Sequence, residues 1–326
     1  MKTLEIKRQV DIRRDSSGKT VKKSGFWSAA AKDFSKYKIL YLMVVPVILY
    51  YLLFCYLPMY GALIAFKNYN PVDGILGSPW VNFKHFKDFF TSYYFVRLLK
   101  NTLIISGSGL LFSFPAPILL ALLINELRLK RYKSMVQTIT YLPHFISLIV
   151  ICGMIRQFTS VDGLINDIVV FFGGTRSTML SNAKLFVPIY IISDIWQTVG
   201  WGSIIYLAAL MGVDQQLYDA ARIDGAGRLR QLFHVTLPGI MPTIVIMLLL
   251  RIGNILNVGH EKIILLYSPL VYDSSDVIST YVYRKGLQEY NWSFSTAVGL
   301  FNSIINFTLV FSSNLFAKKL NGSSLW

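Results

Sequence analysis

The sequence predicts an all-α integral membrane protein with six transmembrane helices. Of its 326 residues, 54% are hydrophobic, which exceeds the apolar share of about 45–50% that is typical of soluble domains. The apolar residues gather in blocks long enough for a bilayer, which a helix crosses with about 20 residues. Lys and Arg gather between alternate blocks, as they do in multi-pass membrane proteins. These three observations predict a helical membrane bundle.

The chain opens on a basic segment, residues 1–38, which holds eleven Lys or Arg residues. It has no apolar stretch of its own, and the apolar run that follows is too long for a cleavable signal peptide. We expect a cytoplasmic tail that anionic lipid attracts. Residues 39–326 form the predicted transmembrane domain, which includes a polar loop at residues 212–238.

Several predicted spans contain prolines. The first span carries Pro46 and Pro58, which membrane helices tolerate as kinks. Pro115 and Pro117 are expected to break the second span near its middle, and Pro143 lies inside the third. The six predicted spans are residues 39–66, 101–124, 135–158, 185–211, 239–257 and 292–316.

Polar segments join these spans, and their charges orient the chain. The N-terminal tail, the segments 125–133 and 212–238 and the C-terminal end hold twenty Lys or Arg residues, whereas the three other connecting segments hold ten. The excess of positive charge marks the cytoplasmic side, so both termini are expected in the cytoplasm of a cell whose plasma membrane the chain crosses. Residues 83–90 are an expected interfacial helix, and part of residues 258–291 is expected to be re-entrant or interfacial.

Composition and motifs exclude several classes of function. The net charge of +15 does not indicate nucleic-acid binding, because the basic residues follow the positive-inside pattern. Cys55 and Cys152 both fall inside apolar spans, so no disulfide framework is expected. The sequence has no metal-ligand spacing and no phosphate-binding GxxxxGK[ST] loop. No cofactor is expected in this chain, and if the protein carries out active transport, the energy must come from another chain.

Two charged residues inside predicted spans are candidate functional groups. Asp194 and Arg251 lie in the fourth and fifth spans, where an ionised side chain is costly and therefore a functional candidate by default. One interpretation is a polar lining of a substrate path or gate. The other is a pair between helices, or a side chain that reaches the interface, and both remain open.

Amide and aromatic side chains in or beside the spans suit a sugar. Amide hydrogen bonds and aromatic stacking are what a saccharide path needs, whereas the alternative is helix packing and the usual interfacial aromatic belt. The candidate substrate-path residues are Asp194, Trp196, Trp201, Arg251, Asn254, Asn257 and Asn302.

The polar loop between the fourth and fifth spans reads as a helix, a glycine elbow and a second helix. Residues 219–223 favour the first helix, Gly225 and Gly227 interrupt the chain, and residues 228–235 suit the second helix. Pro238 is expected to begin the next span. Leu229, Leu232 and Phe233 would be exposed on a bare loop, and exposed apolar patches mark contacts with a partner.

The spacing of this loop resembles a known motif. Permease subunits of bacterial binding-protein-dependent ABC importers carry EAA, three residues, G, nine residues and I-x-L-P. Here Asp219, Ala220 and Ala221 precede Gly225, and Val235, Leu237 and Pro238 follow at the same spacing. The sequence departs from the motif by Asp for Glu and by Val for Ile, and both changes keep the acidic and apolar character.

The resemblance extends over residues 38–326 and is closest to the sugar branch of that family. The segments GALIAFKNYNP, NTLIIS, TYLPHFIS and the terminal GSSLW, together with residues 252–283, are similar to permeases for complex carbohydrates. The resemblance implies the type I importer fold. It implies no enzymatic activity in this chain.

The same resemblance implies an assembly and a role. A second, homologous permease completes a heterodimer, two ATPase subunits bind ATP and Mg²⁺, and an extracellular solute-binding protein delivers an oligosaccharide. The motif residues are then the ATPase-coupling residues. A stand-alone secondary transporter or channel is the alternative, since proline-interrupted spans also occur there. A membrane enzyme would need clustered carboxylates or histidines at a membrane face, and the sequence has none.

Overall fold

The computed structural model describes residue 34 and residues 36–321, and it divides at Gly61 into two units. The regular elements of the described residues are all helices, and the one β-bridge among these residues joins Lys67 to Trp80. The predicted basic tail, residues 1–38, lies almost wholly outside the described residues, as does the terminal segment 322–326. The two units are considered separately.

From Lys38 onward, the described chain begins with one helical run that ends at Phe66. It comprises α2 (Lys38–Tyr50), the π-helical turn η1 (Tyr51–Tyr56) and α3 (Leu57–Met59), followed by the 3₁₀ segment η2 (Tyr60–Phe66). The whole run has 29 residues and is long and apolar enough to cross a membrane. The first predicted span is therefore a helix with the predicted bounds.

The second predicted span is one helix rather than two. It runs from Phe95 to Glu126 over 32 residues, as α6 (Phe95–Ser108), the π-helical turn η3 (Gly109–Ser113) and α7 (Pro115–Glu126). The expected break at Pro115 and Pro117 was wrong. The wider π turn lies where the proline ring would meet the carbonyl four residues earlier, so the helix continues.

The third predicted span is sharply bent. It consists of α8 (Lys130–Tyr141), the 3₁₀ turn η4 (Leu142–Phe145) and α9 (Leu148–Phe158), and the two helical parts meet at 99°. Pro143 lies in η4, and the Ser147 side chain caps the start of α9. The proline and the cap together stop one helix and start the next, so the third predicted span is a bent pair of helices.

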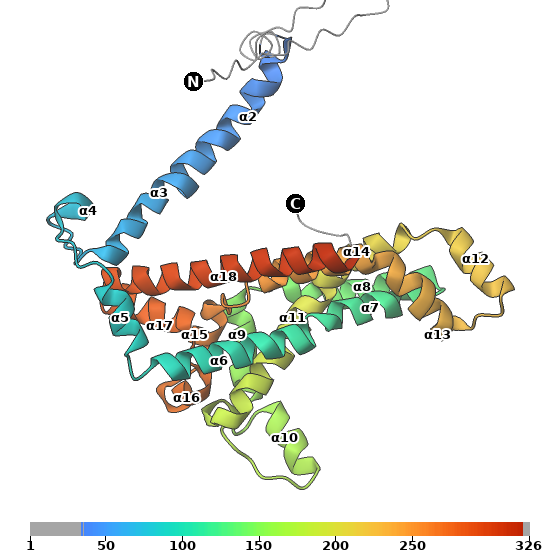
Figure 1. Ribbon diagram of the computed structural model, residues 1–326. Helices are drawn as coiled ribbons and strands as arrows, with labels where there is room; N and C mark the ends of the chain where they lie inside the picture. Colours follow the sequence, from blue (N-terminus) through green and yellow to red (C-terminus); the bar gives the residue numbers. More distant parts are fainter. Residues whose placement is uncertain (1–33, 35, 322–326) are drawn as a thin grey trace, which may run out of the picture. The chain divides into compact units, whose positions relative to one another are not determined.

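The centre of the second unit is α11 (Ala183–Met211), a helix of 29 residues. It packs against α7, α8 and α14 (Leu237–Ile252), as Figure 1 shows. Gly200 permits the contact with α8, because a Cβ there would overlap the carbonyl oxygen of Thr140. This helix coincides with the fourth predicted span.

The polar loop contains α12 (Gln215–Ile223) and α13 (Arg228–Gln231), and it projects at one end of the second unit (Figure 1). From α13 the chain passes through the π-helical turn η6 (Leu232–Thr236) into α14 without interruption, over 25 residues. Pro238 therefore does not begin the span, as the sequence suggested, but lies inside a longer helix.

The remaining elements include one long helix, α18, and several short ones. The long α18 (Trp292–Asn321) packs against α14, α17 and α5, and a helix is present as α5 where the sequence predicts one at residues 83–90. The other elements are α4 (Gly74–Gly77), α5 (Lys84–Phe90), α10 (Leu164–Phe171), η5 (Met179–Ser181), α15 (His260–Leu266), η7 (Pro269–Val271), α16 (Tyr272–Ser275), α17 (Ile278–Tyr283) and η8 (Arg284–Gln288).

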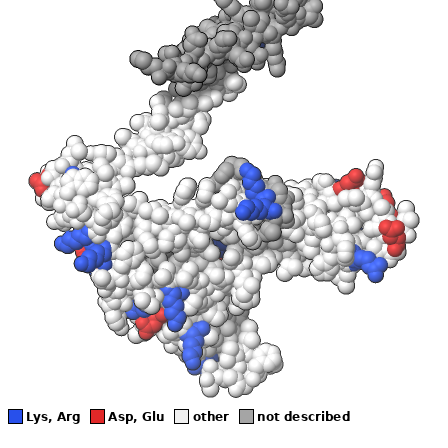
Figure 2. Space-filling model, viewed as in Figure 1, with Lys and Arg blue, Asp and Glu red and all other residues white. Residues whose placement is uncertain are grey.

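Length and composition allow a multi-pass membrane protein. Four helices of the described chain are long and apolar enough to cross a membrane, or five if the bent pair α8–α9 is one span. Because α11 carries several polar residues, it is not counted among these helices. Figure 2 shows charged side chains toward both ends of the second unit and one basic cluster near its middle, with largely uncharged surface elsewhere on this face. The all-helical membrane class is thus confirmed.

Candidate functional site

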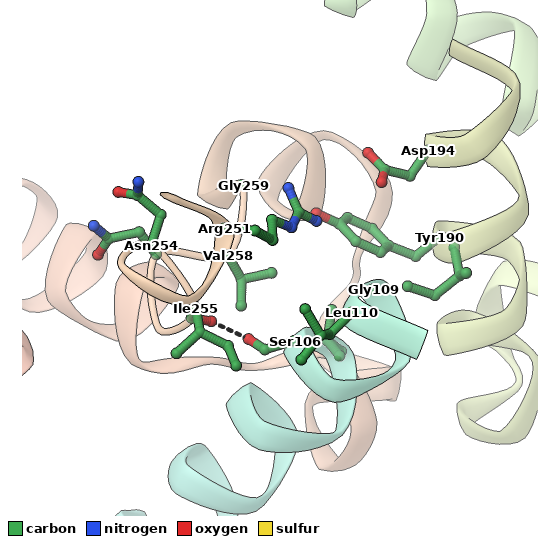
Figure 3. A pocket seen from close by; sticks show the side chains of 13 residues that line it. Ser106, Gly109, Leu110, Tyr190, Asp194, Arg251, Asn254, Ile255, Val258 and Gly259 are labelled. Carbon is green, nitrogen blue, oxygen red and sulfur yellow. Dashed lines mark hydrogen bonds between the residues drawn. The ribbon is translucent and has the colours of Figure 1, made fainter. Parts of the chain in front are cut away.

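A cavity of about 260 Å³ lies within the second unit, where α6 and η3 face α11 and the C-terminal end of α14 (Figure 3). The turn that follows α14 closes one side. The residues that line the cavity are Ile105, Ser106, Gly109, Leu110, Tyr190, Ile191, Asp194, Arg251, Asn254, Ile255, Asn257, Val258 and Gly259.

The cavity brings together most of the predicted substrate-path residues. Asp194, Arg251, Asn254 and Asn257 all line it, although they come from α11, α14 and the turn after α14. Asn302 of α18 donates a hydrogen bond from Nδ2 to Asn257 Oδ1 at 2.8 Å, so it holds one of the lining amides. These contacts give the cavity a wall of amide and charged groups.

The two predicted tryptophans lie outside this cavity. Trp201 stacks on the His144 ring, with centroids 4.5 Å apart and an interplanar angle of 3°. Trp196 is exposed. Neither side chain lines the cavity, so aromatic stacking on a ligand there would have to come from Tyr190.

One interpretation that the sequence left open, a pair between helices, applies to Asp194. Asp194 Oδ1 lies 4.0 Å from Lys262 Nζ of α15, and this is its ion-pair partner. Arg251 has no hydrogen-bond or ion-pair partner among the described side chains. Figure 3 shows its guanidinium pointing toward the side of α11 that carries Tyr190 and Asp194.

Sequence reasoning missed four residues of this region. Tyr190 and Ser106 line the cavity, and Ser106 Oγ donates a hydrogen bond to the Ile255 carbonyl (Figure 3). Gly109 gives Arg251 room, since a Cβ there would lie 3.2 Å from its Nη2. Lys262 was visible only as one cation in a polar connecting segment. None of the four carries a local signal, because their roles depend on contacts between distant helices.

The predicted coupling residues lie on an exposed, internally bonded loop. Asp219, Ala220 and Ala221 are on α12, where Asp219 pairs with Arg222 at 3.1 Å. Gly225 ends this helix with φ +73°, a left-handed conformation that favours glycine. The amide of Ala226 then donates to the Ala221 carbonyl at 2.8 Å. The glycine elbow is therefore confirmed by the backbone.

Side-chain bonds join the two halves of this loop. The Tyr218 hydroxyl donates to Thr236 Oγ1 at 3.0 Å, which connects α12 with η6. Gln231 Nε2 donates to the Ala226 carbonyl at 2.7 Å. Val235 lies in η6, and Leu237 and Pro238 begin α14. The motif residues thus belong to one folded unit.

Apolar side chains cover part of the outer surface of this loop. Ile223, Leu229 and Phe233 are exposed by 87%, 73% and 61%. Leu232, which was also expected to be exposed, is half-buried and lines a cavity beneath the loop. An exposed apolar patch of this kind marks a contact surface.

A buried ionic network holds α16 and α17 to the start of α6. Asp276 is fully buried and accepts hydrogen bonds from Arg284 at 2.7 Å and from Thr280 at 2.8 Å. Arg97 of α6 lies 3.7 Å from the same carboxylate. Burial alone would lower the pKa of Arg284, but the bond to Asp276 and its charge raise the pKa above the ordinary value. This network ties the segment around α16 and α17 to the start of α6.

Comparisons with known proteins agree with this architecture. Residues 113–322 match the family described as "Binding-protein-dependent transport system inner membrane component". The chain is 45% identical over 318 residues to protein LplB of Bacillus subtilis, covering 97% of this chain and 99% of LplB. It is 47% identical over 290 residues to the polygalacturonan/rhamnogalacturonan transport system permease protein YteP of the same organism, covering 89% and 90% of the two chains.

A solved structure extends the comparison to the fold. The crystal structure of a bacterial alginate ABC transporter, in complex with an alginate pentasaccharide-bound periplasmic protein, contains a similar chain. Its TM-score is 0.84 at 43% identity, over 90% of this chain and 99% of that one. The resemblance that the sequence motif carried is confirmed, and the family is one of transport permeases rather than enzymes. This chain belongs to the inner membrane components of binding-protein-dependent transport systems, in the sugar branch of the type I ABC permeases.

Proposed function

We propose that this chain is a membrane-spanning subunit of an ATP-driven importer, and that it takes up an oligosaccharide which an extracellular solute-binding protein delivers. One observation carries the proposal. A single helical run of 25 residues begins in the exposed loop at Arg228 and ends at Ile252, beside the polar cavity. A straight helix of that length spans roughly 37 Å, so the loop and the cavity are ends of one rigid element.

The loop is the proposed contact with the ATPase. The chain has no nucleotide-binding loop of its own, and its motif residues, Asp219 to Gly225, are exposed or half-buried on α12. Two ATPase subunits would bind ATP and Mg²⁺ and would hold this loop and its counterpart on a second permease. Closure of the ATPases would then move α12 and α13, and with them α14, as a rigid body.

The cavity is the proposed substrate path. Its amides and guanidinium offer hydrogen-bond donors and acceptors to the hydroxyl groups of a sugar. Relatives named for polygalacturonan, rhamnogalacturonan and alginate transport favour a complex carbohydrate. Delivery by a binding protein is supported by the related transporter that was crystallised with its periplasmic protein.

Six spans with both termini in the cytoplasm remain the proposed topology. The four long apolar helices supply four spans, and α8–α9 and α11 would supply the other two. The excess of Lys and Arg in the segments on the loop side supports a cytoplasmic position for α12 and α13.

Reconstitution of the assembled transporter in proteoliposomes tests this function. We expect uptake of a labelled oligosaccharide only when ATP and the binding protein are both supplied. A matched sample with ATP replaced by a non-hydrolysable analogue is the control. Uptake driven by an ion gradient without ATP would instead establish the stand-alone secondary transporter that the sequence left as the alternative.

A further inference from the structure

The wall of the polar cavity is formally neutral, because it contains one carboxylate, Asp194, and one guanidinium, Arg251. If these two groups formed a pair, the cavity would present only neutral donors and acceptors to a ligand. They do not form an ion pair in the structure. A third charged group, which does not line the cavity, pairs with Asp194 and so determines which charge a ligand meets.

That third group is Lys262. Its side chain is only 6% exposed, and its Nζ lies 4.0 Å from Asp194 Oδ1 and 5.2 Å from the centroid of the Tyr190 ring. Nζ has no hydrogen-bond partner. Burying an ammonium group is costly unless an opposite charge lies nearby, and Asp194 supplies that charge. Burial lowers the pKa of Lys262, and the Asp194 carboxylate opposes this effect.

The Asp194–Lys262 pair leaves the guanidinium of Arg251 free. No acidic side chain of the described residues pairs with Arg251, and Gly109 leaves it space on the α6 side. Arg251 shares the cavity with the amides of Asn254 and Asn257. A guanidinium without a counter-charge is suited to a carboxylate, which it binds through two parallel hydrogen bonds.

We propose that Lys262 makes this cavity selective for acidic sugars, because it compensates Asp194 and leaves Arg251 to bind the carboxylate of a hexuronate unit. The inference rests on the proposed function and adds the charge class of the substrate. The cavity, about 260 Å³, is smaller than the roughly 300–1,000 Å³ of pockets that enclose a drug-sized ligand. It would therefore hold one unit of a longer chain. Lys262 acts through Asp194 and is a positioning residue, whereas Arg251 contacts the substrate.

Equilibrium binding to the assembled transporter in nanodiscs tests the inference without the binding protein's own selectivity. The probes are trigalacturonate and trimannuronate, each compared with its fully methyl-esterified form, which has the same length and stereochemistry but no charge. Arg251→Gln is expected to weaken binding of the acids about tenfold or more, as loss of a charged hydrogen bond does. Binding of the esters should stay within about twofold.

The Lys262 variants separate charge compensation from a merely structural role. Lys262→Met leaves Asp194 uncompensated beside Arg251, so the ratio of acid to ester affinity should fall severalfold. Lys262→Arg keeps the charge and should retain the ratio. The double variant Asp194→Asn/Lys262→Met removes both members of the pair and should recover the ratio to within about twofold of the wild type.

Three further variants distinguish the proposed charge effect from a loss of folding. Asp194→Asn alone leaves Lys262 in place and should keep or raise the preference for acids. Gly109→Ala crowds Arg251 without changing any charge and should weaken acid binding, whereas Gly107→Ala, where a Cβ meets nothing within 4 Å, should not.

Equal affinity for acids and esters in the wild type, or no binding of either, overturns the inference. So does a Lys262→Met variant that assembles and keeps the acid preference, or a double variant that does not recover it. ATP-driven uptake of a neutral oligosaccharide alongside any of these results would leave the proposed function intact. Absence of ATP-driven uptake would instead remove the proposed function.

Discussion

At the scale of the residue, two glycines of the exposed loop look alike in the sequence and differ in the backbone. Gly225 has φ +73°, whereas Gly227 has φ −68°. A Cβ at either position would meet nothing within 4 Å. Steric room is therefore equal, and only the backbone conformation distinguishes them.

Gly225→Ala should accordingly impair the loop, and Gly227→Ala should not. An L-residue in the left-handed region costs about 1–2 kcal/mol, which would destabilise the end of α12 where the proposed ATPase contact lies. The expected result is faster amide hydrogen exchange in α12 and more ATP hydrolysed per sugar transported. Equal behaviour of the two variants would contradict the role that we assign to this conformation.

Which residues line the cavity could be predicted from the sequence more readily than which residues they pair with. Asp194 and Arg251 stood out because a charge in an apolar run is costly, and both do line the cavity. The ion-pair partner of Asp194 is Lys262, 68 positions along the chain. No periodicity or spacing reports a contact at that separation, so the pairing was invisible before the helices were placed.

At the scale of the element, prolines changed the helices less than the sequence indicated. Pro58, Pro115 and Pro238 each lie two residues after a π-helical turn, and each helix continues through its proline. The carbonyl that the proline ring would meet, four residues earlier, falls inside the wider turn in every case. Local rules predict a break or a helix start at such positions, whereas the wider turn accommodates the proline and the helix continues.

The ionic network on α16 and α17 offers a prediction at this scale. Asp276→Asn removes a fully buried carboxylate that Arg284 and Arg97 share, and breaking a buried pair costs about 3–5 kcal/mol. The thermal unfolding midpoint of the purified transporter should therefore fall clearly.

Asp273→Asn is the matched control. Asp273 pairs with the same Arg97 at 3.1 Å, but its side chain is 85% exposed, and exposed pairs contribute about 0–1 kcal/mol. Its unfolding midpoint should hardly change. If the two variants unfolded at the same temperature, the network would not hold this segment as described.

At the scale of the whole molecule, charge asymmetry predicts which side of the membrane each segment occupies. Ile223 in α12 is 87% exposed, and Val72, in the segment after the first span, is 89% exposed. In a variant with Cys55 replaced by serine, Cys152 is the remaining native thiol and is buried. Single cysteines at the two exposed positions therefore report the topology.

A membrane-impermeant maleimide applied to intact cells should label Val72→Cys and spare Ile223→Cys. Permeabilised cells that express the permease without its ATPase should label both, because the charge excess places the loop inside and no partner then covers Ile223. Labelling of Ile223→Cys from outside would reverse the proposed orientation, and with it the proposed ATPase contact.

The sequence by itself determined the membrane class, the positions of the apolar helices, the glycine elbow and the motif that carries the family. All of these are local properties: hydropathy is summed over about 20 neighbours, and a motif is a spacing along one chain. The tertiary structure decided the 99° bend of α8–α9, the union of α13 with α14, and the set of polar residues that share one cavity. It also decided that Asp194 faces Lys262 and that Arg251 is left without a counter-charge, because burial and distance between remote helices, not spacing, govern which charges meet.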